Sequence, residues 1–357
     1  MNQKKWIKTS LLMAFSIVLV VGMINYIIDP FHQYRIKTFY PIAYIPKLQR
    51  YINPGFAKNY DYDSVILGSS MSENFNISNV KNILGFQKSI KLCISGTSAY
   101  EEALTLKTAL RHKKVKNVLY GLDTFLFWGD SKRIRHDKKT FPFYLYDNNL
   151  LNDYQYIFSV DTLIKSLKSL MSLFDDRSKV TYDYNRMYQW QHSVPSSHFS
   201  VEYVLQRWEN RVESDIAYQP KNNFYFYKKS FDKNFLSLIK VYPKTNFIIY
   251  FPPYSILAYK LEEEYNVFEE RLKFKKYILE ATSKLSNVKI YDFQVAKLIT
   301  HELSNYHDLD HYHQKINKWI LEQIKENNFR VNISNINAII EEHKKQVNDY
   351  EILGEKL

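Results

Sequence analysis

The stretch Ser64-Val65-Ile66-Leu67-Gly68-Ser69-Ser70 decides the fold. Its first four residues form a short β-prone run with little polar alternation, which is typical of a strand buried on both faces of a parallel sheet. The glycine that follows permits a tight turn at the carboxyl end of that strand. The stretch therefore predicts a buried strand whose end presents the hydroxyl of Ser70.

Similar β-prone runs recur along the chain, and each ends in polar, glycine or proline residues: 90–94, 117–120, 247–251 and 288–291. Stretches rich in helix formers lie between or after them, at 100–111, 262–283 and 314–326. Strands that alternate with helices predict an α/β domain with a central parallel sheet and helices on both of its faces. The loops at the carboxyl ends of such strands build the active site.

The alternation breaks down between Gly129 and Pro243, where the chain is rich in Tyr, Lys and Asn. We interpret about 130–243 as an inserted cap over a domain of residues 60–330, with helices near 153–173 and 199–213. The alternative is a further strand and helix hidden inside this segment. Residues 331–357 follow as a C-terminal segment with a solvent-facing helix at 336–350.

Twenty uncharged residues run from Thr9 to Ile28. As a helix they span about 30 Å, the hydrocarbon thickness of a bilayer. Lysines at 4, 5 and 8 precede them, so the positive-inside rule predicts a cytoplasmic tail (1–8), one transmembrane anchor (9–28), a linker (29–59) and an extracytoplasmic domain. The rival interpretation is a cleaved signal peptide, but no small-x-small cleavage site follows the apolar run. We expect a single-pass protein of the plasma (inner) membrane.

The composition limits the kinds of molecule that the chain is expected to bind. Hydrophobic residues make up 45% of the chain and charged residues 24%, which is ordinary for a globular protein, and the formal net charge is +12. The basic residues are scattered and no nucleic-acid motif occurs, so we expect no nucleic acid and interpret the charge as suited to anionic lipid or an acidic glycan, or simply to solubility. The only cysteine is Cys93, which excludes an internal disulfide.

The segment Tyr306–Tyr312 (YHDLDHY) lies after the last predicted strand and before the helix at 314–326. An Asp three residues before a His on a loop can orient the imidazole through one ring nitrogen while the other faces a nucleophile. Ser70 is nucleophilic only if such a base takes its proton. The pattern predicts a triad of Ser70, His311 and Asp308.

Two alternatives stay open for this loop. Asp310 and His313 have the same spacing and offer a second carboxylate–imidazole pair. Four of the ten histidines also fall within 301–313, and clusters of this kind can bind zinc, although the spacing matches no standard zinc signature. We favour the triad and expect neither a metal nor a cofactor.

Taken together, these motifs resemble the SGNH (GDSL-like) hydrolase superfamily, whose first block carries a Gly-x-Ser nucleophile and whose last block reads Asp-x-x-His. The resemblance implies a flavodoxin-like three-layer sandwich and an oxyanion hole built by Ser70, by Gly96 and by the residue at Asp123. The family normally has an Asn at that third position. An ionised Asp123 cannot donate a hydrogen bond, so this sequence departs from the family pattern at the third oxyanion position.

The anchor, the Gly-Ser-Ser block and the Asp-x-x-His-Tyr ending are similar to a membrane-tethered bacterial subgroup. It includes the D-alanine transfer protein of teichoic acid modification and the O-acetylation proteins of alginate and peptidoglycan. The resemblance implies an extracytoplasmic serine esterase or O-acyltransferase that acts on a cell-envelope glycan with an acyl donor, beside a multi-span O-acyltransferase. The alternative is a non-catalytic accessory or glycan-binding partner of such an acyltransferase.

Overall fold

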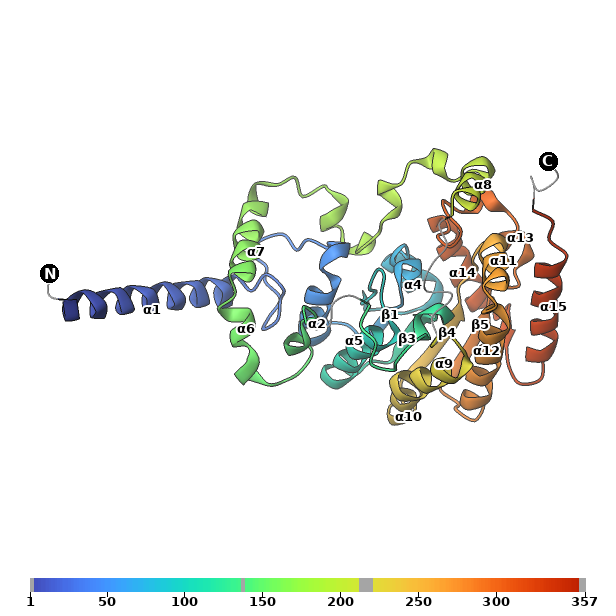
Figure 1. The fold of residues 1–357 in the computed structure, drawn as a ribbon, viewed down its shortest axis with the longest axis horizontal. Helices are drawn as coiled ribbons and strands as arrows, with labels where there is room; N and C mark the ends of the chain where they lie inside the picture. The colour runs from blue at the N-terminus through green and yellow to red at the C-terminus, as the bar shows by residue number, and fades with distance from the viewer. Residues whose placement is uncertain (1–2, 136–138, 212–220, 353–357) are drawn as a thin grey trace.

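The computed structural model describes residues 3–135, 139–211 and 221–352, and its centre is a six-stranded sheet with helices on both sides (Figure 1). The strands are β1 (Ser64–Leu67), β2 (Ser89–Lys91), β3 (Asn117–Gly121), β4 (Asn246–Phe251), β5 (Val288–Asp292) and β6 (Arg330–Val331). They lie in the order β2-β1-β3-β4-β5-β6. The five expected strands are present and parallel, which confirms the α/β class.

The sheet is mixed rather than purely parallel, because β6 pairs with β5 in the antiparallel direction. The sequence analysis missed β6 because two residues, only one of them apolar, give no periodic signal. The order of the parallel strands, 2-1-3-4-5, is that of doubly wound flavodoxin-like sheets. Their switch point lies where β1 sits between β2 and β3, and ligands bind outside the carboxyl ends of the strands at such a point.

Both faces of the sheet are covered. All four residues of β1 are buried, and Val65 pairs with Ile90 on one side and with Val118 on the other. The helices are α1 (Gln3–Ile28), α2 (Gln49–Asn59), α3 (Ser70–Glu73), α4 (Ile77–Leu84), α5 (Ala99–His112), α6 (Tyr154–Ile157), α7 (Val160–Met171), α8 (Val201–Glu209), α9 (Phe224–Phe231), α10 (Ser237–Val241), α11 (Ile256–Glu264), α12 (Phe268–Thr282), α13 (Lys297–Thr300), α14 (Gln314–Glu326) and α15 (Ile336–Asn348). Around the sheet, α4 packs on α14, while α5, α9 and α12 form a second group (Figure 1).

Local chemistry accounts for several helix ends. α5 begins with a capping box, in which Ser98 accepts from the Glu101 amide and the Glu101 carboxylate accepts from the Ser98 amide.

The single helix expected at 262–283 is instead two helices, α11 and α12. The chain turns between them at Asn266, whose φ of 57° is left-handed. Asparagine tolerates that conformation, so it ends one helix without requiring a glycine.

Residues 29–59, predicted as a linker, are part of the packed domain. They contain η1 (Pro46–Leu48) and α2, and α2 buries Ile52, Phe56 and Ala57 while it packs on α5. The expectation was wrong because the apolar positions of α2 are interrupted by Asn53, Pro54 and Gly55, which hid the helical period.

The segment about 130–243 contains short helices, and the described residues between Gly121 and Asn246 contain no strand. α6 and α7 correspond to the helix expected at 153–173, and α8 to the one at 199–213. α1 projects from the rest of the molecule (Figure 1). It is the one helix among the described residues that is long and apolar enough to cross a membrane, a property that signal sequences share.

Candidate active site

The turn Gly68-Ser69-Ser70, which carries the predicted nucleophile and is called the nucleophile turn below, connects β1 to α3. Gly68 has a φ of 144°, and a Cβ there would lie 2.4 Å from Ser72 Oγ and 3.0 Å from the Gly121 carbonyl oxygen. A side chain at this position is therefore excluded both by conformation and by space. Ser69 follows as the N-cap, where its hydroxyl accepts from the Met71 amide. Ser70 is the first helical residue and is partly exposed at the carboxyl end of the sheet.

A short closed loop presents the base. Tyr306 and Tyr312 form an antiparallel bridge, and the His307 amide donates to the His311 carbonyl at 3.1 Å. Inside the loop, Asp308 Oδ1 accepts from the amides of Asp310 at 2.9 Å and His311 at 2.7 Å. The Asp308 carboxylate therefore fixes the backbone conformation of the loop as well as facing the imidazole.

The structure brings Ser70, His311 and Asp308 into one hydrogen-bonded chain. Ser70 Oγ lies 2.8 Å from His311 Nε2, and His311 Nδ1 lies 2.8 Å from Asp308 Oδ2. A carboxylate at Nδ1 selects the tautomer that carries its proton there, which leaves Nε2 free to accept the proton of Ser70. The contact spans 241 residues of sequence, so the fold and not local geometry creates it.

Carboxylates control the electrostatics of this chain. Burial alone would lower the pKa of His311, but Asp308, with smaller effects from Asp310 and Glu73, outweighs burial and raises that pKa to about 9. Burial opposes ionisation of Asp308, yet the neighbouring His311 holds the pKa of Asp308 below its usual range. Both shifts stabilise the imidazolium–carboxylate pair that forms when the histidine takes a proton.

The predicted oxyanion residue Gly96 lies in the loop after β2 with a φ of 54°. That loop is joined to the nucleophile turn, because the Ile94 amide donates to the Gly68 carbonyl at 3.0 Å. Arg50 from α2 holds the loop from the other side, with Nη2 2.7 Å from the Gly96 carbonyl oxygen. Gly96 and Ser70 therefore belong to two adjacent, mutually braced loops at one edge of the sheet.

Asp123 follows β3 and is fully buried. Its Oδ1 accepts a hydrogen bond from the Tyr254 hydroxyl, whereas its Oδ2 is buried without a hydrogen-bond partner. Burial raises the pKa of Asp123 to about 6, although Ser69 and Tyr254 oppose the shift. The carboxyl group is therefore neutral in mildly acidic solution, and a neutral Asp123 has a hydroxyl that can donate.

Sequence reasoning missed two residues that touch this site. Trp190, from the inserted segment, donates from Nε1 to the Ser70 carbonyl at 2.9 Å, and its ring stands edge-on to His311 at 5.4 Å. Gln49 of α2 donates to Glu73 at 2.7 Å and accepts from the Ser95 amide at 2.8 Å. Neither residue belongs to a motif, and each reaches the site only through the tertiary fold.

His313, the base of the alternative pair, has a different role in the structure. It is the N-cap of α14, its Nδ1 accepts from the Lys315 amide, and its ring packs on Phe199. The other carboxylate, Asp310, borders a cavity of about 250 Å³ beside Leu309 and Phe125. The geometry thus favours Asp308 and His311 over Asp310 and His313 as the triad pair.

The metal alternative rests on His307, Asp308 and His311, whose ligand atoms all lie within 4.8 Å of one another. His311 Nδ1 lies 2.8 Å from Asp308 Oδ2, so these two candidate ligand atoms are already joined to each other by a hydrogen bond. A metal there would replace the hydrogen bond that joins the base to its carboxylate, so these residues fit a triad better than a metal site.

Comparisons with known proteins give little further information. No protein-family profile matches the chain, and no curated protein is significantly similar to it. Among the solved structures that match, one is similar at 10% identity and a TM-score of 0.35, over 79% of this chain and 91% of that one. It is described as "The structure of a putative platelet activating factor from Streptococcus pneumonia". At that level of similarity the functional argument rests on the site itself.

Proposed function

We propose that the chain is a serine esterase or O-acyltransferase with the SGNH fold, anchored in the plasma (inner) membrane by α1. The observation that carries the proposal is the continuous hydrogen-bonded chain from Ser70 through His311 to Asp308. The parallel sheet supports it, because the nucleophile turn and the Gly96 loop both stand at the carboxyl ends of strands beside the switch point.

The reaction begins with transfer of the Ser70 proton to His311 Nε2 as Ser70 Oγ attacks the carbonyl carbon of an ester. The negative charge that develops on the carbonyl oxygen needs hydrogen-bond donors, for which the amides of Ser70 and Gly96 are the candidates. His311 then gives its proton to the leaving alcohol, and an acyl-serine remains. Asp308 stays ionised throughout and stabilises the imidazolium.

The second half of the reaction decides between the two activities. Water that attacks the acyl-serine completes ester hydrolysis, whereas a sugar hydroxyl completes acyl transfer, and His311 acts as the base in either case. We assign a cell-envelope glycan as substrate or acceptor, because the anchor would place the domain outside the cytoplasm, next to the envelope. A multi-span O-acyltransferase is the proposed partner that would supply acyl groups.

A fluorophosphonate probe tests the nucleophile directly, because it phosphonylates only an activated serine. We expect the full-length protein in detergent to be labelled, Ser70→Ala to abolish labelling, and Ser69→Ala to retain it. Ser69 is the matched control, since it lies in the same turn and its hydroxyl caps α3. Labelling that survives in Ser70→Ala but disappears in Ser69→Ala would contradict the assignment.

The competing proposal is a non-catalytic accessory that binds glycan or a membrane acyltransferase. Asp123 favours it, because an ionised carboxylate at an oxyanion position repels the charge that must form there. Wild-type protein that remains unlabelled across a wide pH range, while it binds envelope glycan, would decide for the accessory. Labelling at Ser70 decides for the enzyme.

A further inference from the structure

α7 has its polarity inverted relative to an ordinary surface helix. The side chains buried against the protein are the small polar residues Thr162 and Ser166. Its exposed face is apolar and carries a stripe at helical spacing, formed by Val160, Ile164, Leu167 and Met171 and extended by Phe174 of η5 (Ser172–Phe174). A helix in water buries its apolar stripe and exposes its polar one.

The polar face of α7 is buried because it meets a polar residue in α1. Asn25 donates to the carbonyls of Ile157 at 2.8 Å and Ser159 at 3.0 Å, and it accepts from Ser166 Oγ at 2.9 Å. The approach is close, since a Cβ at Gly22 would lie 2.5 Å from Phe158 Cε1. The α6–α7 segment is therefore joined to the carboxyl-terminal part of α1 by specific hydrogen bonds and by tight packing.

These contacts set the depth of the segment. Gly22 lies six residues before the end of α1 at Ile28, which corresponds to about 9 Å along a helix axis. Amphipathic helices at a membrane surface are buried about 5–10 Å into the boundary between headgroups and acyl chains. If the uncharged run that ends at Ile28 spans the bilayer, α6 and α7 lie at this depth.

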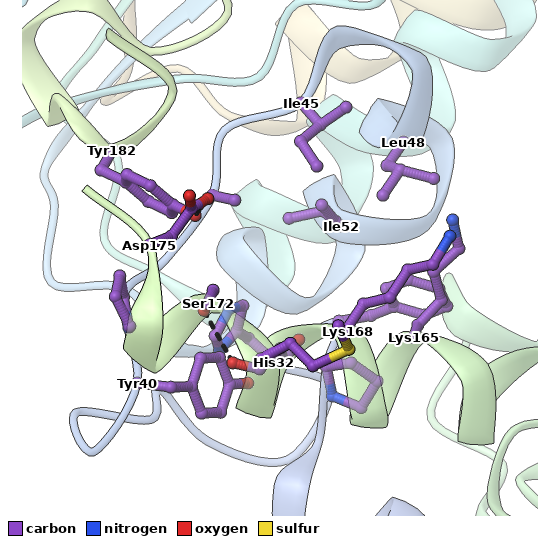
Figure 2. A pocket seen from close by; sticks show the side chains of 16 residues that line it. His32, Tyr40, Ile45, Leu48, Ile52, Lys165, Lys168, Ser172, Asp175 and Tyr182 are labelled. Atoms are coloured by element: carbon purple, nitrogen blue, oxygen red, sulfur yellow. Dashed lines mark hydrogen bonds between the residues drawn. The ribbon is translucent and has the colours of Figure 1, made fainter. Parts of the chain in front are cut away.

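Three residues of the stripe, Val160, Ile164 and Leu167, face away from the rest of the protein. Lys165 and Ser172, on the flank of the helical segment, line a cavity of about 390 Å³ together with Tyr40 and Ile45, and Met171 at the end of the stripe also borders it (Figure 2). In Figure 1, α7 lies across the end of α1, between α1 and the sheet domain. A membrane spanned by α1 would therefore lie on the side of α7 from which α1 emerges.

Exposed apolar side chains are concentrated in this part of the molecule. Among the described residues outside α1, ten of the sixteen large exposed apolar side chains lie within 150–174. They are Leu150, Leu151, Tyr154, Phe158, Val160, Ile164, Leu167, Met171, Leu173 and Phe174. Lys165 and Lys168 lie on α7 and are balanced within the segment by Asp153 and Asp161, while Arg35 stacks on Tyr26 at the end of α1. Aromatic rings and long lysine side chains beside an apolar face suit a membrane interface.

We propose that residues 150–174 form a membrane-docking segment that lies in the outer interface of the bilayer spanned by α1, with its apolar stripe among the acyl chains. The inference rests on the anchoring role of α1 in the proposed function. A single helix would let the domain rotate and tilt about its end. The second attachment fixes the orientation of the domain, and therefore of Ser70, relative to the membrane surface.

Spin labels on the full-length protein in vesicles of phosphatidylcholine and phosphatidylglycerol test this segment. The native Cys93 is buried, so a cysteine introduced at an exposed position takes the label, with unlabelled wild type as the blank. Ile164→Cys and Leu167→Cys report the stripe. Leu298→Cys is the matched control, an exposed leucine outside the segment, and Val18→Cys reports insertion of α1. Circular dichroism checks that each variant is folded.

The measured quantity is the ratio of nitroxide collision with oxygen, which partitions into lipid, to collision with a water-soluble nickel complex. We expect this ratio to be several-fold higher at 164 and 167 than at 298, and highest at 18. A low ratio at 164 and 167 with a high ratio at 18 would contradict the docking segment alone. The stripe would then be a surface that binds a protein partner. A low ratio at 18 overturns the anchor itself, so the two failures are distinguishable.

Discussion

The proposed mechanism requires opposite protonation states of His311 and Asp123. His311 must be neutral to accept the proton of Ser70, and with a pKa raised to about 9 its neutral fraction grows as pH rises toward that value. Asp123 must be protonated to donate to an oxyanion, and with a pKa near 6 its protonated fraction falls as pH rises. Between these values each group is mostly in its unproductive form, so the proposed activity should be low in this pH range.

Asp123→Asn removes one of these conflicting requirements. An asparagine amide donates a hydrogen bond at every pH. If the ionised Asp123 of the wild-type protein leaves the oxyanion without a donor, we expect Asp123→Asn to raise the turnover of an activated ester above pH 7 by up to about 10²-fold. The rising limb that belongs to His311 should remain. Asp123→Leu is the control, because it removes both the donor and the charge. Asp123→Asn that is no faster than Asp123→Leu at pH 8 would show that position 123 donates nothing to the oxyanion.

The choice between the two Asp–His pairs can be tested by single substitutions. We expect Asp308→Asn and His311→Ala each to lower turnover by about 10³-fold or more, because the carboxylate fixes the tautomer and the imidazole carries the proton. Asp310→Asn and His313→Ala should have small effects, since His313 caps α14 instead. The double variant Asp308→Asn/His311→Ala should be little slower than His311→Ala, as members of a triad act as a unit. Ester turnover of all five variants at one pH would measure this, and the reverse ranking would move the triad by two residues.

At the scale of elements, α2 joins two loops of the site. Gln49 donates to Glu73, which follows the nucleophile on α3, and accepts from Ser95, which precedes Gly96. Gln49→Met keeps much of the volume and removes both bonds, so a buried carboxylate loses its donor and a partly buried amide loses its acceptor. We expect the free energy of unfolding to fall by about 1–3 kcal/mol, and turnover to fall with it.

Urea unfolding of the detergent-solubilised full chain, followed by tryptophan fluorescence, measures this change. Lys47→Ala is the matched control, because Lys47 is exposed two residues earlier, and we expect it to shift stability by no more than about 0.5 kcal/mol. Equal stability in both variants would mean that the two hydrogen bonds of Gln49 contribute little to the stability of the domain.

Some elements were predictable from the sequence because their signals are local. The run 64–67 has three consecutive apolar residues after Ser64 and is followed by a glycine, and β1 has those bounds. The helix expected at 314–326 coincides with α14. Ser70 and Asp308–His311 could be proposed because each sits in a short motif after a predicted strand, and the structure places them in contact.

The remaining features depend on tertiary contacts. Trp190 reaches the Ser70 carbonyl across 120 residues of sequence, within a segment without periodic pattern. Gln49 is a polar residue that is buried only because two loops converge on it. The raised pKa of Asp123 likewise follows from burial that composition cannot reveal. Each would require knowing which segments are packed together, information that propensity and spacing do not carry.

At the scale of the whole molecule, the first and last helices lie at opposite ends of the structure (Figure 1). α1 extends away from the sheet, and α15 lies at the far side of the domain from it (Figure 1). Asp29, directly after α1, accepts from the amides of Gln33 and Tyr34 and from the Tyr156 hydroxyl. The end of α1 is therefore hydrogen-bonded into the domain, and we expect these bonds to favour retention of α1 over its removal as a leader.

We therefore expect α1 to be retained and the domain to be exported. Intact-mass measurement of the protein purified from membranes should include residues 1–28, and an alkaline carbonate wash should leave the protein in the membrane fraction. Alkaline phosphatase fused after Leu357 should be active, because that enzyme folds only outside the cytoplasm, whereas a cytoplasmic reporter at the same position should be inactive.

Replacing Lys4, Lys5 and Lys8 with Gln removes the charges that hold the N-terminus in the cytoplasm, and the phosphatase signal should fall as a fraction of chains inverts. Mature protein that begins after Ile28 would instead mean that α1 is a signal sequence. The contacts of Gly22 and Asn25 with the α6–α7 segment would then be absent from the mature protein. The docking segment would lose its partner in the same experiment, so the fate of α1 decides whether the molecule is held at the membrane by two attachments or by none.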